Sequence, residues 1–440
     1  MHSPSPDPDA PSSPSSDTPA RPRERFEPLG PVAGKQRIDS IDILRGLAVL
    51  GILAMNIGGF VMPLAAYTNP KIWGGDGVNI GVWFFNHFFF DQKFLPIFSM
   101  LFGAGLILMY ERAKDQDELL AGVYYRRTML LIFFGFLHAY LIWWGDILFF
   151  YGVCGLFLFL FRKASVRSLL VVGGCLFLMN IPINMLQGFH LKTLSGEMAK
   201  ITAKKEQEWK QISAMMAPSE RKIQRTIEVY QTGSYGEIFK ERAGFLLMFQ
   251  PGGLFAFAFW RCGGLMLIGM ALMRLGIFSG QRSRSFYVRM VALGYGIGIP
   301  IVAVGAYWIA RSDWDPYELM LTGVHWNHVG SVPVSLGHVA VLMLVIQSGA
   351  LQGLTERLRQ VGRMAFTNYL MQSVVLTTVF YGYGFGLYGQ VDRLGQWGFV
   401  VAMWVAQLWW SPLWLRHFRF GPAEWLWRTM TYGQVQPLRR

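Results

Sequence analysis

The stretch RIDSIDILRGLAVLGILAMNIGGF, residues 37–60, decides the fold of this chain. It opens with a charged cluster, residues 37–45, and passes directly into an uncharged run of 21 residues, 46–66. About 20 apolar residues cross the hydrocarbon core of a bilayer as a helix. The stretch therefore predicts a membrane span with a charged lip.

One side of this predicted helix carries polar groups. Separations of three, seven and eleven residues return to the same side of a helix, which places Asp42, Arg45, Val49 and Asn56 on one stripe. Polar groups on a membrane helix face protein or water rather than lipid. The first span therefore predicts partner helices around a polar interior.

The composition extends this prediction to the whole chain. Of 440 residues, 52% are hydrophobic and 15% are charged, and the uncharged runs recur along the sequence. The net charge is +13, and the charged residues lie between these runs rather than in one patch. This distribution is typical of the positive-inside rule, and we expect no nucleic-acid partner. The three cysteines all lie within apolar runs, which favours ordinary packing over disulfides. We expect an all-α polytopic membrane protein.

The chain divides into four predicted parts. Nine prolines and six serines in residues 1–36 indicate a disordered cytoplasmic tail. The other parts are an N-terminal membrane half of five spans, 37–187, an amphipathic helical insert on the outer side, 188–242, and a C-terminal half of five spans, 243–440. Two apolar helical faces define the insert: Ile201, Trp209, Ile212 and Met215, then Ile223, Ile227 and Tyr230.

About ten transmembrane helices are expected, some of them interrupted. The predicted spans are 46–66, 78–110 (an entry helix 78–90, a break at 91–93 and a span), 128–145, 147–161, 168–187, 243–273 (a short re-entrant or interfacial piece and a span), 290–310, 329–350, 364–383 and 394–415. Segments assigned to the inside hold three to five lysines or arginines each, whereas the short outside loops hold Lys71, Arg311 and Arg393. This bias predicts that both termini face the cytoplasm.

Asp42 and Arg45 are a first candidate pair, at spacing i,i+3 near the inner face. They either fix the depth of the helix end or serve a ligand. In the second case Arg45 would hold an anionic group that enters from the cytoplasm, such as a nucleotide phosphate.

His138 lies near the middle of the predicted span 128–145, with Asp146 just after it. An imidazole at that depth is costly unless it faces a polar cavity, where it can act as a general base. The alternative is a histidine bonded across a helix interface. Eight residues of continuous helix separate His138 and Asp146 by about 12 Å, so we expect Asp146 to pair with another span.

His87 and Asp91 form an i,i+4 pair on the entry helix, beside Lys93. They line an outer vestibule or anchor the helix at the interface. An aromatic outer loop contains four further polar residues, Asp313, Asp315, His325 and His328. These residue types can bind a metal, but we interpret the loop as structural and predict no metal site.

Five pieces of sequence resemble the YeiB family of bacterial integral membrane proteins. They are IDILRGLAVLGILAMNI (41–57), DQKFLPIFSMLFGAG (91–105), RRTMLLIFFGFLHAYLIWWGDILFFYG (126–152), GRMAFTNYLMQS (362–373) and FGPAEWLWRTMTYGQVQPLRR (420–440). The resemblance implies a many-span protein of the bacterial inner (cytoplasmic) membrane. Some members have been labelled possible transporters, and the C-terminal half is classed as of unknown function.

The D-x-x-R-G pattern at Asp42–Gly46 is more remotely similar to transmembrane acyltransferases, namely heparan-alpha-glucosaminide N-acetyltransferase and the type 3 membrane family. Those enzymes pass an acyl group from a cytoplasmic coenzyme A thioester to a sugar on the opposite side. Type 3 members carry a histidine eleven residues after the motif arginine, where this chain has Asn56, as the heparan enzyme does. The heparan enzyme's active histidine lies shortly before a tryptophan in the next outer loop. Here the residues directly before Trp73, 68–72, include no histidine. His138 or His87 must then be the base.

The leading interpretation is a membrane-embedded acyltransferase with a cytoplasmic acyl-CoA donor and an extracytoplasmic glycan or lipid acceptor. His138 would be the base, and the donor and orienting groups would be Arg45, Asp42, Asn56, Arg126, Arg127, Arg363 and Asp146. The alternatives are a transporter or channel for a small solute or lipid, and a non-catalytic protein that binds a lipid or a partner. The sequence leaves the oligomeric state open, a homo-oligomer included.

Overall fold

The computed structural model describes residues 37–113, 116–196, 218–315 and 318–440. Within these ranges every regular element is a helix, and β-structure is limited to one isolated bridge between Phe418 and Arg439. The expected all-α class is therefore confirmed. The predicted helical face Ile201, Trp209, Ile212 and Met215 lies outside the described residues.

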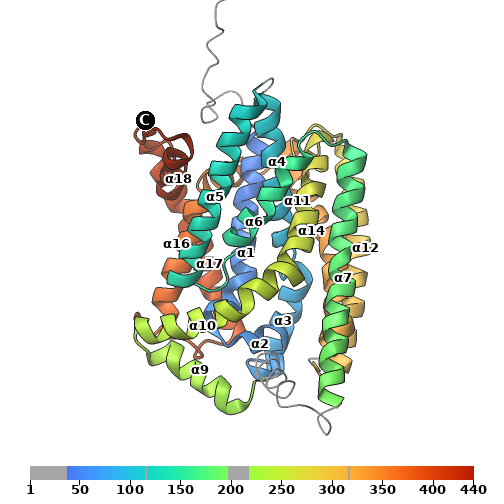
Figure 1. The fold of residues 1–440 in the computed structure, drawn as a ribbon, viewed down its shortest axis with the longest axis vertical. Helices are drawn as coiled ribbons and strands as arrows, with labels where there is room; N and C mark the ends of the chain where they lie inside the picture. The colour runs from blue at the N-terminus through green and yellow to red at the C-terminus, as the bar shows by residue number, and fades with distance from the viewer. Residues whose placement is uncertain (1–36, 114–115, 197–217, 316–317) are drawn as a thin grey trace, which may run out of the picture.

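The first predicted span is helix α1 (Asp39–Val61), at the centre of the bundle (Figure 1). Its apolar window is 78% buried, against 22% for that of α7 (Val166–Gly196), so α1 packs against protein on nearly all sides. The helix begins within the charged cluster, at Asp39, so Asp42 and Arg45 are part of it, as expected. It ends at Val61 because Pro63 disfavours helical geometry in Met62, whose φ and ψ are −142° and 163°.

The remaining helices follow in chain order (Figure 1). They are α2 (Leu64–Thr68), α3 (Gly77–Phe89), α4 (Phe94–Arg112), α5 (Asp117–Leu141), α6 (Leu148–Leu158), α7, α9 (Glu220–Thr232), α10 (Tyr235–Gly253), α11 (Phe259–Arg274), α12 (Arg284–Arg311), α14 (Val324–Ser348), α15 (Gln352–Arg363), α16 (Ala365–Phe380), α17 (Arg393–His417) and α18 (Pro422–Tyr432). Two π-helical segments precede α11 and α14: Leu254–Ala258 and Leu319–Gly323.

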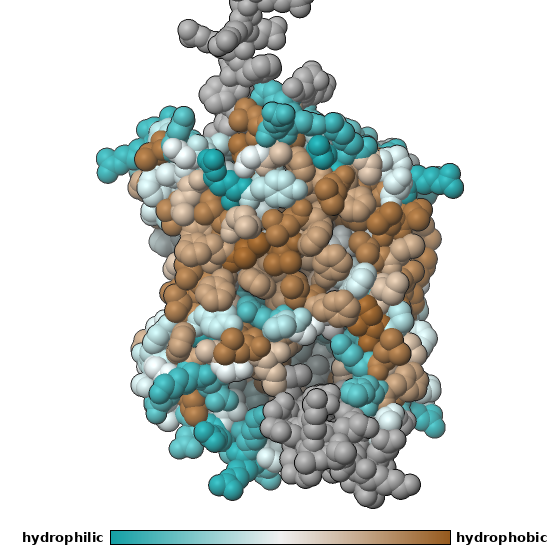
Figure 2. All heavy atoms as spheres, in the orientation of Figure 1, coloured by the Kyte–Doolittle hydropathy of each residue, from teal (hydrophilic) through white to brown (hydrophobic). Residues whose placement is uncertain are grey.

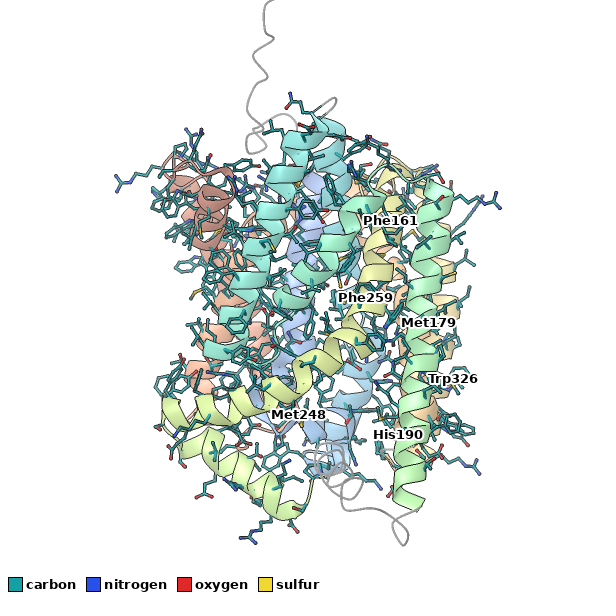
Figure 3. The ribbon with its side chains drawn as sticks, viewed as in Figure 1. Phe161, Met179, His190, Met248, Phe259 and Trp326 are labelled. Atoms are coloured by element: carbon teal, nitrogen blue, oxygen red, sulfur yellow. The ribbon has the colours of Figure 1, made fainter. Side chains whose placement is uncertain are left out.

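Among the described residues, seven helical stretches are long and apolar enough to cross a membrane: α1, α3 with α4, α5, α7, α12, α14 with its π segment, and α17. Three expected spans correspond to the shorter helices α6, α11 and α16, of 11, 16 and 16 residues. An apolar band crosses the visible face between two polar ends (Figure 2). Met179 and Trp326 are exposed on the outside of this region, as lipid-facing side chains are (Figure 3).

The predicted break at 91–93 is confirmed. Helices α3 and α4 are separated by a short turn in which Gln92 has a φ of 60°. The predicted boundary between the insert and the C-terminal half, at 242–243, lies inside α10, which crosses the bundle obliquely before the chain turns into α11 (Figure 1). The second predicted face of the insert is also confirmed, because Ile227 and Tyr230 of α9 are buried.

Two glycines bring the backbones of α1 and α15 into contact. A Cβ on Gly362 would lie 1.8 Å from the carbonyl oxygen of Asp42, and one on Gly46 would lie 2.0 Å from that of Leu358. A side chain at either position would force the helices apart. This crossing places the charged end of α1 beside Arg363, the last residue of α15.

Candidate active site

A cavity within the described residues opens at the arginine-rich end of the bundle, where the chain also ends (Figure 1). Its volume is about 300 Å³. Helices α1, α4, α5, α6, α15, α16 and α18 contribute to its wall. Away from the mouth the wall is mainly apolar, with side chains such as Ile52, Phe98, Leu101 and Leu148.

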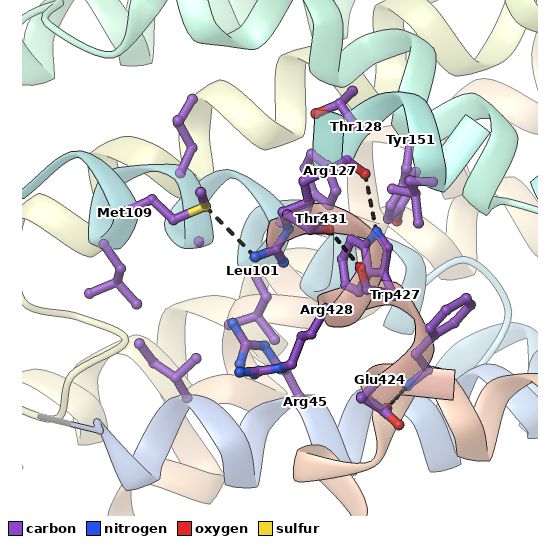
Figure 4. Close-up of a pocket in the computed structure, with 18 of the residues that line it drawn as sticks. Arg45, Leu101, Met109, Arg127, Thr128, Tyr151, Glu424, Trp427, Arg428 and Thr431 are labelled. Atoms are coloured by element: carbon purple, nitrogen blue, oxygen red, sulfur yellow. Dashed lines mark hydrogen bonds between the residues drawn. The ribbon is translucent and has the colours of Figure 1, made fainter. Parts of the chain in front are cut away.

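Positive charge dominates the mouth of this cavity. Two carboxylates, Asp42 and Glu424, line it together with six arginines: Arg37, Arg45, Arg112, Arg127, Arg363 and Arg428. Arg45, Arg127 and Arg428, from three helices, turn toward one space (Figure 4). The predicted Asp42–Arg45 pair forms with an N···O distance of 3.2 Å, and Arg37 also binds Asp42.

Glu424 neutralises little of this charge because its carboxylate caps α16. Its Oε1 accepts hydrogen bonds from the backbone N–H groups of Phe366 at 2.7 Å and Thr367 at 3.1 Å, and its Oε2 accepts one from the Thr367 hydroxyl. Burial, partly opposed by these hydrogen bonds, raises the pKa of Glu424. Asp42 is thus left as the carboxylate that forms ion pairs at the mouth.

Arg428 is a poorly compensated arginine of the mouth. Within the described part of the chain it forms no hydrogen bond or ion pair, and its guanidinium lies 4.6 Å from the centre of the Phe420 ring. Burial, with the neighbouring Arg127 and Arg37, lowers the pKa of Arg428 to about 10. Burial and nearby arginines likewise lower the pKa of Arg363 to about 10. The mouth therefore favours an anion.

At its inner end the cavity meets a buried polar network. Tyr369 lines the cavity at this end, and the centre of its ring lies 5.2 Å from that of His138. His138 Nδ1 lies 2.9 Å from Asp146 Oδ1, and its Nε2 lies 2.9 Å from the Ser373 hydroxyl oxygen. His138, Asp146 and Ser373, the three members of this network, are all buried.

The expectation that His138 and Asp146 lie about 12 Å apart is wrong. Helix α5 ends at Leu141 rather than continuing to Gly145, which leaves His138 in its last turn. The backbone N–H groups of Ile142 and Trp143 both bond to the carbonyl of His138, and the chain then folds back. Asp146 Oδ2 accepts the N–H of Phe149 at 2.7 Å as α6 begins. The axial rise of a helix does not apply across this turn, so Asp146 reaches the histidine of its own connection.

Two neighbours hold the turn in place. Arg242 of α10 is fully buried and donates hydrogen bonds to the carbonyls of Tyr140 at 2.9 Å and Ile142 at 2.6 Å. These are among the last carbonyls of α5, which no amide of the helix itself can satisfy. Trp143 donates to the Gly59 carbonyl at 3.2 Å and so ties the turn to α1. The predicted insert therefore supports the histidine through α10.

The other predicted site residues lie elsewhere. Arg126 does not line the cavity, and its guanidinium donates to the Thr431 carbonyl at 3.2 Å, which fastens α18 to α5. Asn56 and His87 are also outside the lining. His87 contacts Asp91 with an N···O distance of 3.4 Å in a separate cluster. The structure thus unites Asp42, Arg45, Arg127 and Arg363, with His138 and Asp146 beyond the inner wall.

Sequence reasoning missed several residues of the site. Arg112, Arg428, Glu424, Tyr369 and Ser373 join it through tertiary contacts. Tyr369 and Ser373 fall within GRMAFTNYLMQS, and Glu424 and Arg428 within the chain's ending, both already quoted for their resemblance to a family. That resemblance was the available signal, because no spacing links position 373 to position 138.

Comparisons with known proteins give the family. Residues 272–434 match the family model described as "Protein of unknown function (DUF418)". "Uncharacterized protein YxaH" of Bacillus subtilis (strain 168) is 33% identical over 428 residues, which cover 94% of this chain and 98% of the relative. "Uncharacterized protein YeiB" of Escherichia coli (strain K12) is 34% identical over 410 residues, 91% of this chain and 98% of the relative. No solved structure matches the chain. The chain is therefore a member of the YeiB family, whose C-terminal part is the DUF418 domain.

Proposed function

We propose that this protein is a membrane acyltransferase that takes an acyl group from a cytoplasmic acyl-CoA and delivers it to a glycan or lipid acceptor on the outer side. The observation that carries the proposal is the cavity, whose mouth is lined by arginines and whose inner end meets the His138–Asp146 pair. A cationic mouth and an apolar interior suit a donor with phosphates at one end and an acyl chain at the other.

The mouth suits the phosphates for a specific chemical reason. Guanidinium groups bind phosphate through paired, charge-assisted hydrogen bonds. Arg428 and Arg363 have pKa values lowered to about 10 by burial and by other arginines, so an anion between them relieves both costs. The cavity volume of about 300 Å³ is at the lower end of ligand pockets, which span roughly 300–1,000 Å³. It suits the thioester end of the donor, with the nucleotide outside the mouth.

The His138–Asp146 pair would supply base catalysis. An ionised Asp146 accepts hydrogen bonds through both oxygens, which leaves the proton of a neutral imidazole on Nδ1 and the lone pair on Nε2. His138 would remove the proton of the attacking hydroxyl as the new C–O bond forms. The C–S bond of the thioester then breaks, and the departing thiolate takes that proton from His138.

The proposal includes a topology. The arginine-rich end, with both ends of the described chain, would face the cytoplasm. The three shorter helices α6, α11 and α16 would then complete ten spans with the seven long stretches. Deep in this arrangement, Ser373 is the ninth of the 16 residues of α16, so His138 lies near mid-membrane.

The first test is binding of acetyl-CoA and longer acyl-CoAs to the detergent-purified full chain, followed by release of free thiol. We expect saturable binding that Arg45→Ala weakens and His138→Ala preserves, and thiol release that His138→Ala abolishes. Arg289→Ala is the matched control, because Arg289 is exposed on α12, away from the cavity. If no acyl-CoA binds, the proposal fails.

A buried cluster favours a transporter as the second candidate. Lys93 is fully buried and donates to the carbonyl of His87 and to the side chain of Asn327. Asn327 in turn donates to Asp91 at 2.9 Å. Ionisable side chains inside a membrane domain often mark a solute or proton path. Flux of a solute into proteoliposomes without any thioester would favour this candidate, whereas a scaffold would show neither flux nor turnover.

A further inference from the structure

The Ser373 hydroxyl occupies the position that the proposed base needs. Its oxygen lies 2.9 Å from His138 Nε2, the nitrogen left without a proton when Asp146 holds Nδ1–H. In this tautomer of the neutral imidazole, the hydroxyl donates its hydrogen to Nε2. An acceptor cannot reach this lone pair directly while Ser373 occupies it.

The orientation of Ser373 differs from that of its neighbours. Thr378 in the same helix donates to the carbonyl of Val374 at 2.8 Å, and Ser99 in α4 donates to that of Leu95 at 2.9 Å. This bond to the preceding turn is the usual fate of a hydroxyl inside a membrane helix. Among the described residues, the hydrogen-bond partner of Ser373 is instead the imidazole of another helix.

The polarity of the network matches an activated nucleophile. A carboxylate orients an imidazole, and the imidazole accepts the hydrogen of a hydroxyl, which is the arrangement that makes a serine nucleophilic in acyl transfer. The backbone N–H of Phe149, which donates to the other oxygen of Asp146 at 2.7 Å, fixes the orientation of the carboxylate. The relay thus runs from Asp146 through His138 to Ser373.

The relay also adjoins the cavity. Tyr369 lies one helical turn before Ser373, Ile147 directly follows Asp146, and both residues line the inner end of the cavity. The Tyr369 ring stands between the cavity and His138, at 5.2 Å between ring centres. A donor whose pantetheine arm runs through the cavity from the mouth would therefore bring its thioester to this ring, which must turn aside for Ser373 to react.

We propose that Ser373 is the nucleophile of a two-step transfer that proceeds through an acyl-serine; this inference rests on the proposed function. In the first step Ser373 Oγ bonds to the thioester carbonyl carbon, its proton passes to His138 Nε2, and the C–S bond breaks. The coenzyme A thiolate then takes that proton and leaves. In the second step the acceptor hydroxyl, or water, gives its proton to His138 and attacks the ester, and Ser373 leaves with the proton that His138 returns.

The test is to incubate the purified full chain with a long-chain acyl-CoA and no added acceptor, and to measure free thiol and intact mass. We expect thiol release together with an adduct of the acyl mass on the peptide that contains Ser373. Ser373→Ala should bind the acyl-CoA but form no adduct, with thiol release lowered about 100-fold or more. Thr377→Ala, a buried hydroxyl one turn further along α16, is the control and should retain both signals.

The conservative variant Ser373→Cys guards against a purely structural effect, because it should restore an adduct, now as a thioester. Unchanged thiol release by Ser373→Ala would overturn the role of Ser373 and leave the acyltransferase proposal intact. Thiol release by the wild type with no adduct in either the wild type or Ser373→Cys would also overturn it, in favour of direct transfer. Failure of the wild type to bind any acyl-CoA would overturn both proposals.

Discussion

Replacing Gly362 with alanine tests whether the contact between α1 and α15 builds the cavity mouth. A Cβ at this position would lie 1.8 Å from the carbonyl oxygen of Asp42. Ordinary carbon–oxygen contacts begin near 3.3 Å, so the two helices must separate by about 1.5 Å. Overpacking of this kind costs about 1–3 kcal/mol in the free energy of unfolding.

The same displacement should weaken ligand binding. Arg363 directly follows Gly362, and Arg45 lies one turn along α1 from Asp42, so the separation moves two arginines of the mouth apart. A charge-assisted hydrogen bond contributes about 1.5–3 kcal/mol, and 1.4 kcal/mol corresponds to a tenfold change in Kd. We therefore expect at least about a tenfold weaker affinity of Gly362→Ala for acyl-CoA.

The assay is thermal unfolding in detergent, with and without acyl-CoA, and direct titration of the ligand. Gly353→Ala is the matched control in the same helix, because a Cβ there meets nothing within 4 Å. It should unfold at the same temperature as the wild type or slightly higher, since alanine favours helix over glycine. Equal unfolding temperatures and affinities for Gly362→Ala and Gly353→Ala would refute the reasoning.

Three further substitutions probe the charge and support of the site. Arg428→Gln removes a guanidinium whose pKa is lowered to about 10 by burial and by neighbouring arginines, so it should raise the unfolding temperature of the unliganded protein and weaken acyl-CoA binding about tenfold. Burial raises the folded-state pKa of Glu424 above its ordinary 4.5, so the stability that this group contributes is present below pH 4.5 and is lost as the pH rises through the folded value. Glu424→Gln should remove that loss, and its unfolding temperature relative to the wild type should increase with pH. Arg242→Met removes two hydrogen bonds to the end of α5, so it should cost about 1.5–3 kcal/mol or more in thermal unfolding and lower thiol release.

Each of these substitutions has a result that counts against the account. A lower unfolding temperature for Arg428→Gln than for the wild type, both without ligand, would show that the charge of Arg428 is compensated in the folded protein. A difference between Glu424→Gln and the wild type that stays constant from pH 4 to pH 8 would contradict the raised pKa. Normal stability and turnover in Arg242→Met would show that α10 does not support the turn that carries His138.

The sequence predicted the parts of the fold that depend on local pattern. Apolar runs gave the helical class, the polar interruption at 91–93 gave the break between α3 and α4, and the spacing of Ile227 and Tyr230 gave the buried face of α9. Helix ends were less predictable. The last turn of α5 is fixed by hydrogen bonds from Arg242, which lies 102 residues from Tyr140 and 100 from Ile142. The sequence near Leu141 contains no signal that predicts this contact.

In the site, too, contacts that depend on local spacing were predictable and contacts that depend on tertiary structure were not. The Asp42–Arg45 pair depends on helical spacing and was predicted. His138 was selected as a candidate from its depth in an apolar run, and its catalytic role stays a prediction. The partners of His138 depend on tertiary structure. Asp146 reaches it because the chain turns back, and Ser373 reaches it from α16, 235 positions along the chain. Arg428 joins the mouth because α18 packs on α5, through the bond from Trp427 to the Arg127 carbonyl at 3.1 Å.

The measurement that tests the central claim most directly is release of free thiol from a long-chain acyl-CoA by the purified full chain, compared between the wild type and His138→Ala at saturating ligand. The account predicts that both proteins bind the acyl-CoA and that thiol release in His138→Ala falls by about 100-fold or more. Equal thiol release by the two proteins would contradict it.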